Sequence, residues 1–570
     1  MGIERTKIHL IDLKQKSFYN LEELKEEMIL YVIQPNKEAF SIVLESYYLI
    51  SSMFKGVLNS IIFIPGESYE LIEYMMANEL INNFKIFSFN MDFLPIDNDL
   101  LSMEKDNCFR EIYIDKNLTS ISELANAFVK LESCFGKVKY RYYKGDNSKI
   151  FDNLVREKEK ENNIKTTEQI LGMITLDRSV DFLTALTTNY TYEGLIDDFF
   201  NINCGTIKIK ESFIRDTSLK NKNSNTEATV TYGLTSSINP FYCQIRCMNY
   251  IDANLFIKQI SEYYHKIAEH NKDKSKASIE EIKKATNDIN TYIKEVKAPL
   301  FANKNILYHI INNISDSQYK QHIKNEQILL TGELPPNLHL YYDDYICDKK
   351  DLNKLLKLLA IECLTQGGVQ DYNIIKRDIL NIYGYQNIFL FRDLENLGWL
   401  KEKAYIKNLI GYSYDQICEK LELVNTEYYK KIEDCAYLMF GFCPLSLKLI
   451  EKGVEGKWNK IQEIVRKMPG EVSFPVDESE IAKPNNALNT IFLVFIGGVT
   501  YAEIEGIRFL NRKFKEQFEK SKDKKPTRTQ LIIVTTCILN TKKIFDNLGK
   551  KFKNNYTMKQ FFEQSQEKKK

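Results

Sequence analysis

The sequence lacks the short motifs by which most enzymes built on α/β folds are recognised. Its 570 residues contain no G-x-x-x-x-G-K-[ST] loop, no G-x-G-x-x-G after a predicted strand, no G-x-S-x-G and no H-E-x-x-H. Without a glycine loop that cradles phosphate, a nucleotide-dependent enzyme is disfavoured. Only six histidines occur, so the options for acid–base chemistry and metal binding are few.

An excess of charge and a long apolar run are also lacking. Lys and Arg number 78 against 77 Asp and Glu, so no global field favours nucleic acid or an anionic membrane. The longest apolar run, IFLVFIGGV at 491–499, is far shorter than the ~18 residues that a membrane span requires. Eleven cysteines are scattered without framework spacing, and no charged-then-apolar leader opens the sequence. These features predict a cytosolic, soluble protein with reduced thiols.

Short β-rich runs alternate with helical patterns in the first part of the chain. Strands are expected at 28–33, 60–65, 84–89 and 110–115. A helix is expected at 120–135, with Ser120 as its N-cap and Glu123 completing a capping box. This alternation predicts a parallel sheet flanked by helices.

Strand patterns then occur in two groups that lie far apart in the sequence. They are expected at 171–176, 228–234, 490–498 and 531–536. Helical patterns fill most of the interval between the second and third of these. The arrangement predicts one α/β domain interrupted by a large, mostly helical insertion at about 246–470.

The insertion contains the pattern of a helical hairpin. After a helix at 252–270, a second helix is expected from a capping box at Ser278 and Glu281 to a stop before Pro299. Another helix is expected from 303 to 314. Two helices with a short join form a hairpin, and its exposed faces are polar. A solvated face is favoured over a partner-binding one from pattern alone.

Four residues resemble a zinc finger by count. Cys243, Cys247, His265 and His270 have the spacing C-x₃-C-x₁₇-H-x₄-H. The intervening residues are predicted to form one helix, which would hold the two pairs roughly 25 Å apart at about 1.5 Å per residue. A structural role is therefore expected for all four.

The segment LDRSVDFLTALTTNYTYEGLIDDFF at 176–200 is rich in carboxylates that could be catalytic, metal-binding or structural. Asp177 ends a predicted strand, and Asp181 follows four residues later. No histidine, ligand set or phosphate loop accompanies them. They are predicted to be scaffold acids that satisfy loose backbone groups. An α/β-domain hydrolase that uses Asp177, Asp181 and Glu193 is the distant alternative.

This segment resembles the signature region of the SM family, the Sec/Munc regulators of SNARE-driven membrane fusion, and most of all its vacuolar protein sorting branch. The resemblance continues in sequence order at 94–128, 140–149, 361–400, 437–451 and 491–510. Ala185 stands where the family usually has Pro, and Cys443 where this branch usually has Ala. The structural signature corresponds here to Asp177, Arg178, Asp181, Glu193, Gly194, Gly497 and Gly498.

The resemblance implies a fold of class α/β + α. It would be a three-domain arch with two α/β parallel-sheet domains, the second discontinuous, and a large, mostly helical insertion domain. Domain 1 is expected at 1–145, domain 2 at 146–245 and 471–570, and domain 3 at 246–470. Within domain 3, residues 246–345 would hold the hairpin and 346–470 the partner-docking part.

The resemblance also implies a protein that has no enzymatic activity, cofactor or metal. It would bind SNARE helices of syntaxin type and R-type and template their assembly, as a subunit of a HOPS- or CORVET-like tethering complex. Its place would be late-endosomal, vacuolar or lysosome-like membranes, contacted indirectly through partners, and nucleic acid is not expected as a partner. The alternative is an SM protein of a Golgi or plasma-membrane step that acts with a syntaxin.

Two surfaces are implied by the same resemblance. A groove for SNARE helices is expected at Ile282, Ile289, Tyr292 and Tyr308. A helical class C tethering subunit is expected to dock at Tyr437, Phe442, Pro444 and Leu445, as two exposed aromatics beside a Pro-Leu pair. Core packing is the open alternative for each residue of the second surface.

Overall fold

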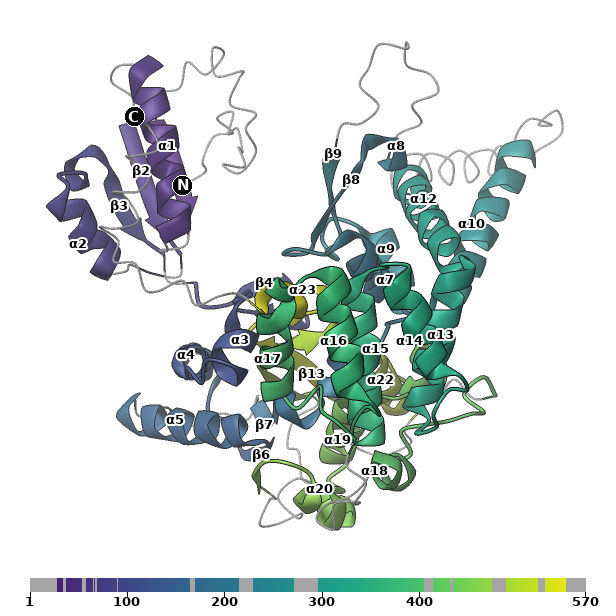
Figure 1. The fold of residues 1–570 in the computed structure, drawn as a ribbon. Helices are drawn as coiled ribbons and strands as arrows, with labels where there is room; N and C mark the ends of the chain where they lie inside the picture. The colour runs from purple at the N-terminus through teal and green to yellow at the C-terminus, as the bar shows by residue number, and fades with distance from the viewer. Residues whose placement is uncertain are drawn as a thin grey trace. The chain divides into compact units, whose positions relative to one another are not determined.

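The computed structural model of the chain (Figure 1) forms two compact units. Unit 1 comprises Met1–Leu94 with Lys551–Lys570, and unit 2 comprises Pro95–Lys550. The structure describes residues 28–33, 37–53, 58–64, 66, 69–89, 91–162, 164, 170–214, 229–270, 296–403, 414–430, 434–473, 488–520 and 528–549.

Unit 1 contains a small parallel sheet that packs against two helices. The strands, in sheet order, are β1 (Met28–Ile33), β2 (Leu58–Phe63) and β3 (Lys85–Ser88). The helices are α1 (Lys37–Met53), α2 (Tyr69–Ala77) and the short η2 (Ile81–Asn83). Phe40 of α1 and Met75 of α2 pack on Ile61 of β2 in one buried core. The three strands predicted for this part of the sequence are confirmed to within two residues.

A seven-stranded sheet in the order β10-β6-β7-β11-β13-β5-β4 forms the centre of unit 2. In chain order its strands are β4 (Leu94–Asp97), β5 (Leu100–Ser102), β6 (Tyr140–Lys144), β7 (Ile170–Asp177), β10 (Val472–Ser473), β11 (Leu488–Ile496) and β13 (Arg528–Thr535). The four pairings from β6 through β7, β11 and β13 to β5 are parallel. Every residue of β7 is buried, as expected for a strand covered on both faces. The predicted interruption of the α/β part is confirmed, because β6 and β7 join strands that follow the helical insertion.

Further strands form two short ladders. An antiparallel pair joins β8 (Thr206–Lys210) to β9 (Thr229–Gly233). A parallel pair joins β12 (Val499–Thr500) to β14 (Ile538–Leu539). The helices of the α/β part are α3 (Cys108–Tyr113), α4 (Thr119–Phe135), α5 (Asp146–Asn162), α6 (Phe182–Leu186), α7 (Tyr192–Phe200), α8 (Glu211–Ile214), α22 (Tyr501–Lys520) and α23 (Thr541–Asn547), with the 3-10 turn η3 (Arg178–Val180).

Two sequence predictions near the first of these helices are wrong. Residues 110–115 belong mostly to the helix α3, not to a strand, because Phe109, Ile112 and Tyr113 are buried at helical spacing. The capping box expected for α4 is also absent. Ser120 Oγ donates to Glu111 at 2.6 Å instead. Asn117, which precedes the helix, accepts from Thr119 N through its Oδ1 at 3.0 Å.

The insertion is almost entirely helical. Its helices are α9 (Pro240–Ile245), α10 (Tyr250–His270), α12 (Lys297–Ile314), α13 (Ser317–Leu330), α14 (Leu338–Cys347), α15 (Leu352–Gln366), α16 (Tyr372–Tyr383), α17 (Ile388–Asn396), α18 (Tyr414–Leu421), α19 (Leu445–Val454) and α20 (Gln462–Lys467). Among the described residues of the insertion, the 3-10 turns are η6 (Tyr385–Asn387), η7 (Cys435–Met439) and η8 (Trp458–Ile461). The α/β + α class predicted from the sequence is confirmed, whereas the three-domain boundaries stay a prediction.

The helices α10 and α12 pack side by side and project from the rest of unit 2 (Figure 1). The predicted stop before Pro299 is wrong, because α12 begins at Lys297 and holds Pro299 in its first turn. Proline is tolerated there, since the N–H that it lacks has no acceptor within the helix. The helix expected from Ser278 lies outside the described residues up to position 295. Within the described ranges, no helix has both the length and the apolar character of a membrane span.

Candidate functional site

Asp177 ends β7 and joins three segments of unit 2 through its carboxylate. Oδ1 accepts from the Tyr113 hydroxyl at 2.5 Å and from Ser179 N at 3.0 Å, and Oδ2 accepts from Asn147 N at 3.0 Å. These donors belong to α3, to the turn after β7 and to the first turn of α5. Burial and the adjacent Asp177 charge raise the pKa of Tyr113 well above its ordinary value, so its hydroxyl stays a donor. Both oxygens of Asp177 are therefore occupied by the protein itself.

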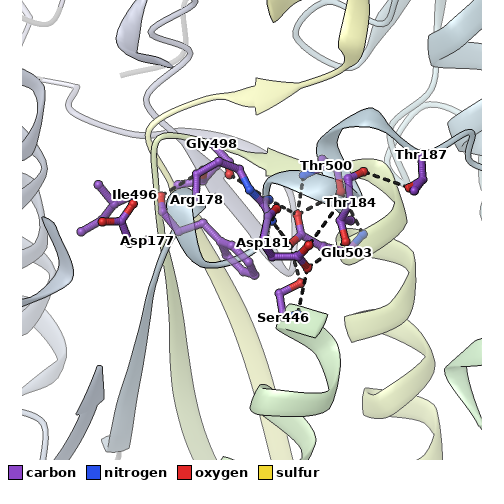
Figure 2. Close-up of polar contacts among 12 residues, drawn as sticks. Asp177, Arg178, Asp181, Thr184, Thr187, Ser446, Ile496, Gly498, Thr500 and Glu503 are labelled. Carbon is purple, nitrogen blue, oxygen red and sulfur yellow. Dashed lines mark hydrogen bonds and ion pairs between the residues drawn. The ribbon is translucent and has the colours of Figure 1, made fainter. Parts of the chain in front are cut away.

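Arg178 makes a buried, two-point ion pair with Glu503 of α22 (Figure 2). Its Nη1 and Nη2 donate to Oε2 and Oε1 at 2.6 and 2.9 Å, and Nη2 also donates to the Asp181 main-chain oxygen at 2.5 Å. The two side chains are 1% and 0% exposed. Burial acts to lower the pKa of Arg178, but the carboxylates of Glu503 and Asp181 outweigh it, so the pKa is raised. The pair holds the end of β7 to the start of α22.

Glu503 and Asp181 also cap helices. Thr500 and Glu503 form a capping box for α22, in which Thr500 N donates to Glu503 Oε2 at 2.9 Å and Glu503 N donates to Thr500 Oγ1 at 3.3 Å. Asp181 accepts from Thr184 N at 3.1 Å as the N-cap of α6. Ser446 N, at the start of α19, donates to Asp181 Oδ2 at 3.0 Å. The acids thus bind helix ends from three parts of the chain, as Figure 2 shows.

Glu193 belongs to a second buried cluster, centred on Arg508 of α22. Arg508 Nη1 donates to Glu193 Oε2 and Glu505 Oε1, each at 2.7 Å, and Nε donates to Asp99 at 3.0 Å. Burial and the negative charge of Glu505 raise the pKa of Glu193 well above its ordinary value. Despite its burial, Glu505 has its pKa lowered to about 2 by Arg508 and by a hydrogen bond from Glu193. The two carboxyl groups therefore titrate as a coupled pair, in which Glu193 holds a proton more tightly than Glu505 does.

The signature glycines are required by close packing. A Cβ at Gly194 would overlap the side chain of Asn189. Gly497 and Gly498 make the turn between β11 and β12 with φ of +83° and +108°, which side-chain-bearing residues rarely adopt. Cβ atoms there would meet the Tyr113 ring and the Leu539 side chain. The turn can lie against these groups only because it has no side chains.

The arrangement does not favour the hydrolase alternative. The carboxylate oxygens of Asp177, Asp181 and Glu193 accept from backbone, hydroxyl and guanidinium donors of the chain. A cavity of about 420 Å³ is lined by other residues, Thr331, Gly332, Glu333, Asp415, Cys418, Glu419 and Val424. In the part of the chain that the structure describes, no group of three or more Cys, His, Asp or Glu side chains could hold a metal ion.

The cysteines and histidines with zinc-finger spacing occupy separate elements. The prediction that one helix contains the residues between the two pairs is confirmed for 250–264, which belong to α10, whereas Cys243 lies in α9 and Cys247 in the turn that follows. His265 then lies about 22 Å along α10 from its first residue, at ~1.5 Å per residue. The side chain of His270 lies outside the described residues.

The predicted docking residues differ in their exposure. Phe442 is only 5% exposed, so the expectation of two exposed aromatics is wrong for this residue. Its backbone pairs with Val424 in an isolated bridge. Pro444 and Leu445, at the start of α19, are buried as well. Tyr437 is half-buried, and its hydroxyl donates to Asp252 Oδ2 of α10 at 2.5 Å.

Of the predicted groove residues, the structure describes one. Tyr308 lies on α12 and is 67% exposed. Ile282, Ile289 and Tyr292 lie outside the described residues. The groove itself therefore stays a prediction.

The roots of α10 and α12 are held by residues that sequence reasoning missed. The Tyr192 hydroxyl, at the start of α7, donates to Asn303 Oδ1 of α12 at 3.0 Å. Asn249 caps α10 by accepting from Asp252 N at 2.9 Å, and Tyr250 N donates to the Tyr190 main-chain oxygen at 3.0 Å. The Asn-x-x-Asp spacing was a readable N-cap signal, whereas Tyr192 and Asn303 are 111 residues apart and have no local signal. The signature segment thus contacts both helices, at the first residue of α10 and at Asn303 of α12.

The fold and these paired charges define a scaffold that presents the helix pair α10 and α12, which we call the hairpin from here on; of the hairpin predicted at 278–314, the residues up to 295 lie outside the described ones. The Sec1 family model matches residues 6–547, and the chain belongs to the Sec1 family, the SM class that its sequence resembles.

Individual relatives agree with this assignment. Vacuolar protein sorting-associated protein 33A of Rattus norvegicus is 26% identical over 533 residues, which cover 90% of this chain and 85% of the relative. The Unc18-syntaxin 1 complex from Monosiga brevicollis has a TM-score of 0.55 at 13% identity, with 92% of this chain and 89% of that chain covered. The SM protein Vps45 in complex with the Qa SNARE Tlg2 has a TM-score of 0.52 at 14% identity, with coverages of 90% and 84%. The fold is that of SM proteins.

Proposed function

We propose that this chain binds SNARE helices of syntaxin type and R-type at the hairpin formed by α10 and α12 and templates their assembly for membrane fusion, without enzymatic activity. The observation that carries the proposal is that the signature segment contacts both helices, because the Tyr192 hydroxyl donates to Asn303 of α12 and the Tyr190 main-chain oxygen accepts from Tyr250 N of α10. The acids that could have served catalysis hold helix ends instead. Membership of the Sec1 family and the fold shared with the Vps45 complex support the same reading.

A pair of matched tyrosines tests this function. Tyr308 on α12 is 67% exposed, and Tyr385 in η6, away from the hairpin, is 66% exposed. Tyr308→Asp is expected to weaken binding of a fluorescent syntaxin-type SNARE-motif peptide about tenfold, because an apolar anchor loses its partner and a carboxylate is desolvated. Tyr385→Asp is expected to leave the affinity within about twofold. Equal affinities for both variants and the wild-type chain would contradict a binding role for this helix.

We further propose that the chain is a subunit of a HOPS- or CORVET-like tethering complex at late-endosomal or vacuolar membranes. The names of its vacuolar protein sorting relatives support this placement. The docking segment, defined here as residues 434–443, offers Tyr437 at its surface, and a helical class C subunit is the expected partner. Tyr437→Asp should abolish co-purification with the helical C-terminal half of that subunit from the same organism.

A second candidate function is an SM protein that acts with a syntaxin at a Golgi or plasma-membrane step. The shared fold with the Unc18-syntaxin 1 complex favours it. The same co-purification distinguishes the two, because failure of the wild-type chain to bind the class C fragment, with SNARE binding retained, would favour this alternative.

A further inference from the structure

The docking segment contacts the first turn of α10 at Asp252. Asp252 Oδ2 accepts from the Tyr437 hydroxyl at 2.5 Å and from Asn249 Nδ2 at 2.9 Å. Asn249 Oδ1 in turn accepts from Asp252 N, so Tyr437 contacts the residue that Asn249 holds as the cap of α10. Burial and the hydrogen bond to Asp252 raise the pKa of Tyr437, so its hydroxyl remains able to donate. A displacement of Tyr437 therefore acts directly on the first turn of the helix.

A second contact between the same two elements is aromatic. Phe440 of the docking segment has φ of +51°, an unusual value for an aromatic residue. Its ring packs on Tyr250, the first residue of α10, with centroids 5.7 Å apart, and on Tyr190 and Tyr428 at 5.0 and 6.1 Å. Tyr190 belongs to the signature segment that also holds the α10 root through its main-chain oxygen. We name Phe440 with these three tyrosines the Phe440 cluster.

The rest of the docking segment is held firmly. Asn425 N donates to the Gly441 main-chain oxygen at 2.8 Å, and Cys443 N donates to that of Leu423 at 2.8 Å. Asp434 caps η7 through Ala436 N at 3.2 Å and pairs with Lys448 at 3.1 Å. Because both ends of the segment are held by hydrogen bonds, a displacement of Tyr437 is expected to move the groups that Tyr437 contacts rather than to be relieved within the segment.

Helix α10 has the length to turn a small change at its root into a larger one. Its 21 residues span about 30 Å at ~1.5 Å per residue. A tilt of about 5° at the first turn would move the far end by about 3 Å over that length. A shift of this size at the hairpin changes the fit of a bound helix.

We propose that docking of a helical partner on the docking segment is thermodynamically coupled to SNARE-helix binding at the hairpin, through the Tyr437–Asp252 hydrogen bond and the Phe440 cluster. This inference rests on the proposed function. It adds that the two surfaces are not independent, and that Asp252 is the positioning residue between them. Because coupling is reciprocal, each ligand must change the affinity of the other by the same factor.

The coupling can be measured with two probes and two matched variants. The probes are a syntaxin-type SNARE-motif peptide and the helical C-terminal half of the class C subunit, both from the same organism. Asp252→Ala removes the acceptor of Tyr437, and Glu262→Ala removes an exposed acid from the same helix without a contact to the docking segment. In the wild-type chain and Glu262→Ala, saturation with the fragment is expected to change the peptide Kd about three- to tenfold, with the reverse experiment giving the same factor. In Asp252→Ala each probe is expected to bind alone, with a coupling factor below about two.

The outcomes separate this inference from the function on which it rests. Binding of both probes without coupling in the wild-type chain, or unchanged coupling in Asp252→Ala, would overturn the inference and leave the function standing. Failure of both probes to bind would overturn both. Hydrogen exchange of the chain alone gives a partner-free check, because amides of residues 250–257 should exchange several-fold faster in Asp252→Ala than in Glu262→Ala. Equal rates would refute the mechanical link.

Discussion

Replacement of Asp177 by alanine tests whether the signature acids are structural. The substitution leaves Ser179 N and Asn147 N without an acceptor, whereas the Tyr113 hydroxyl keeps the Ile496 main-chain oxygen at 3.1 Å. Each buried donor left unpaired costs about 1–3 kcal/mol. Since both N–H groups are only partly buried, we expect unit 2 to lose about 2–4 kcal/mol of its free energy of unfolding. That loss corresponds to a change of about 30- to 900-fold in the unfolding equilibrium constant.

Tryptophan fluorescence can report the unfolding of unit 2, the unit that contains Asp177. The sequence has two tryptophans, and both Trp399 and Trp458 are fully buried in unit 2. Trp458 packs on Tyr142 of β6, next to β7, and Trp399 packs on Phe109 of α3. The urea midpoint followed by tryptophan emission should therefore fall in Asp177→Ala.

Two further variants serve as a conservative replacement and as a surface control. Asp177→Asn keeps one accepting oxygen and should lose about half as much stability as the alanine variant. Asp343→Ala removes an exposed acid of α14 and should stay within about 0.5 kcal/mol of the wild-type chain. An unchanged midpoint in Asp177→Ala together with lost SNARE-peptide binding would refute the scaffold role and indicate a direct functional one.

Three other substitutions give distinct outcomes. Phe442→Asp places a charge in the core, so we expect the free energy of unfolding to fall by about 3–5 kcal/mol, measured by urea denaturation. A variant as stable as the wild-type chain would contradict the burial of this ring. Gly498→Ala should lower the free energy of unfolding by at least about 2 kcal/mol, because φ is +108° and the added Cβ meets Leu539. The urea midpoint measures this loss, and an unchanged midpoint would show that the turn can rearrange. Glu193 makes the stability of the chain depend on pH, because its pKa in the folded chain is raised above the ordinary glutamate value of 4.5. Its stabilising contribution is present below pH 4.5 and is lost as pH rises through the folded pKa. Glu193→Gln should therefore make the urea midpoint fall less steeply as pH rises. Parallel curves for the variant and the wild-type chain would refute the raised pKa of Glu193.

Much of the fold follows from local pattern. The strands β7 and β11 are long apolar runs because both faces are covered, and the helix at 252–270 has a clear helical period. Residues 110–115 have the pattern of a strand because the buried helix Cys108–Tyr113 has only six residues, too few for its period to differ clearly from that of a strand. The resemblance carried by several ordered segments was enough to place the chain in its family.

The partners of the signature residues were decided only by tertiary structure. Arg178 lies 325 residues from Glu503, and Glu193 lies 315 residues from Arg508. Parallel strands bring such positions together, because each crossover returns the chain to the same end of the sheet after a helix or, here, after the whole insertion. The exposure of Phe442 and Tyr437 was likewise decided by packing in the folded chain, for Tyr437 against the root of α10. Local sequence specifies which face of an element is apolar, but which side chains it meets depends on the long-range packing of the folded chain.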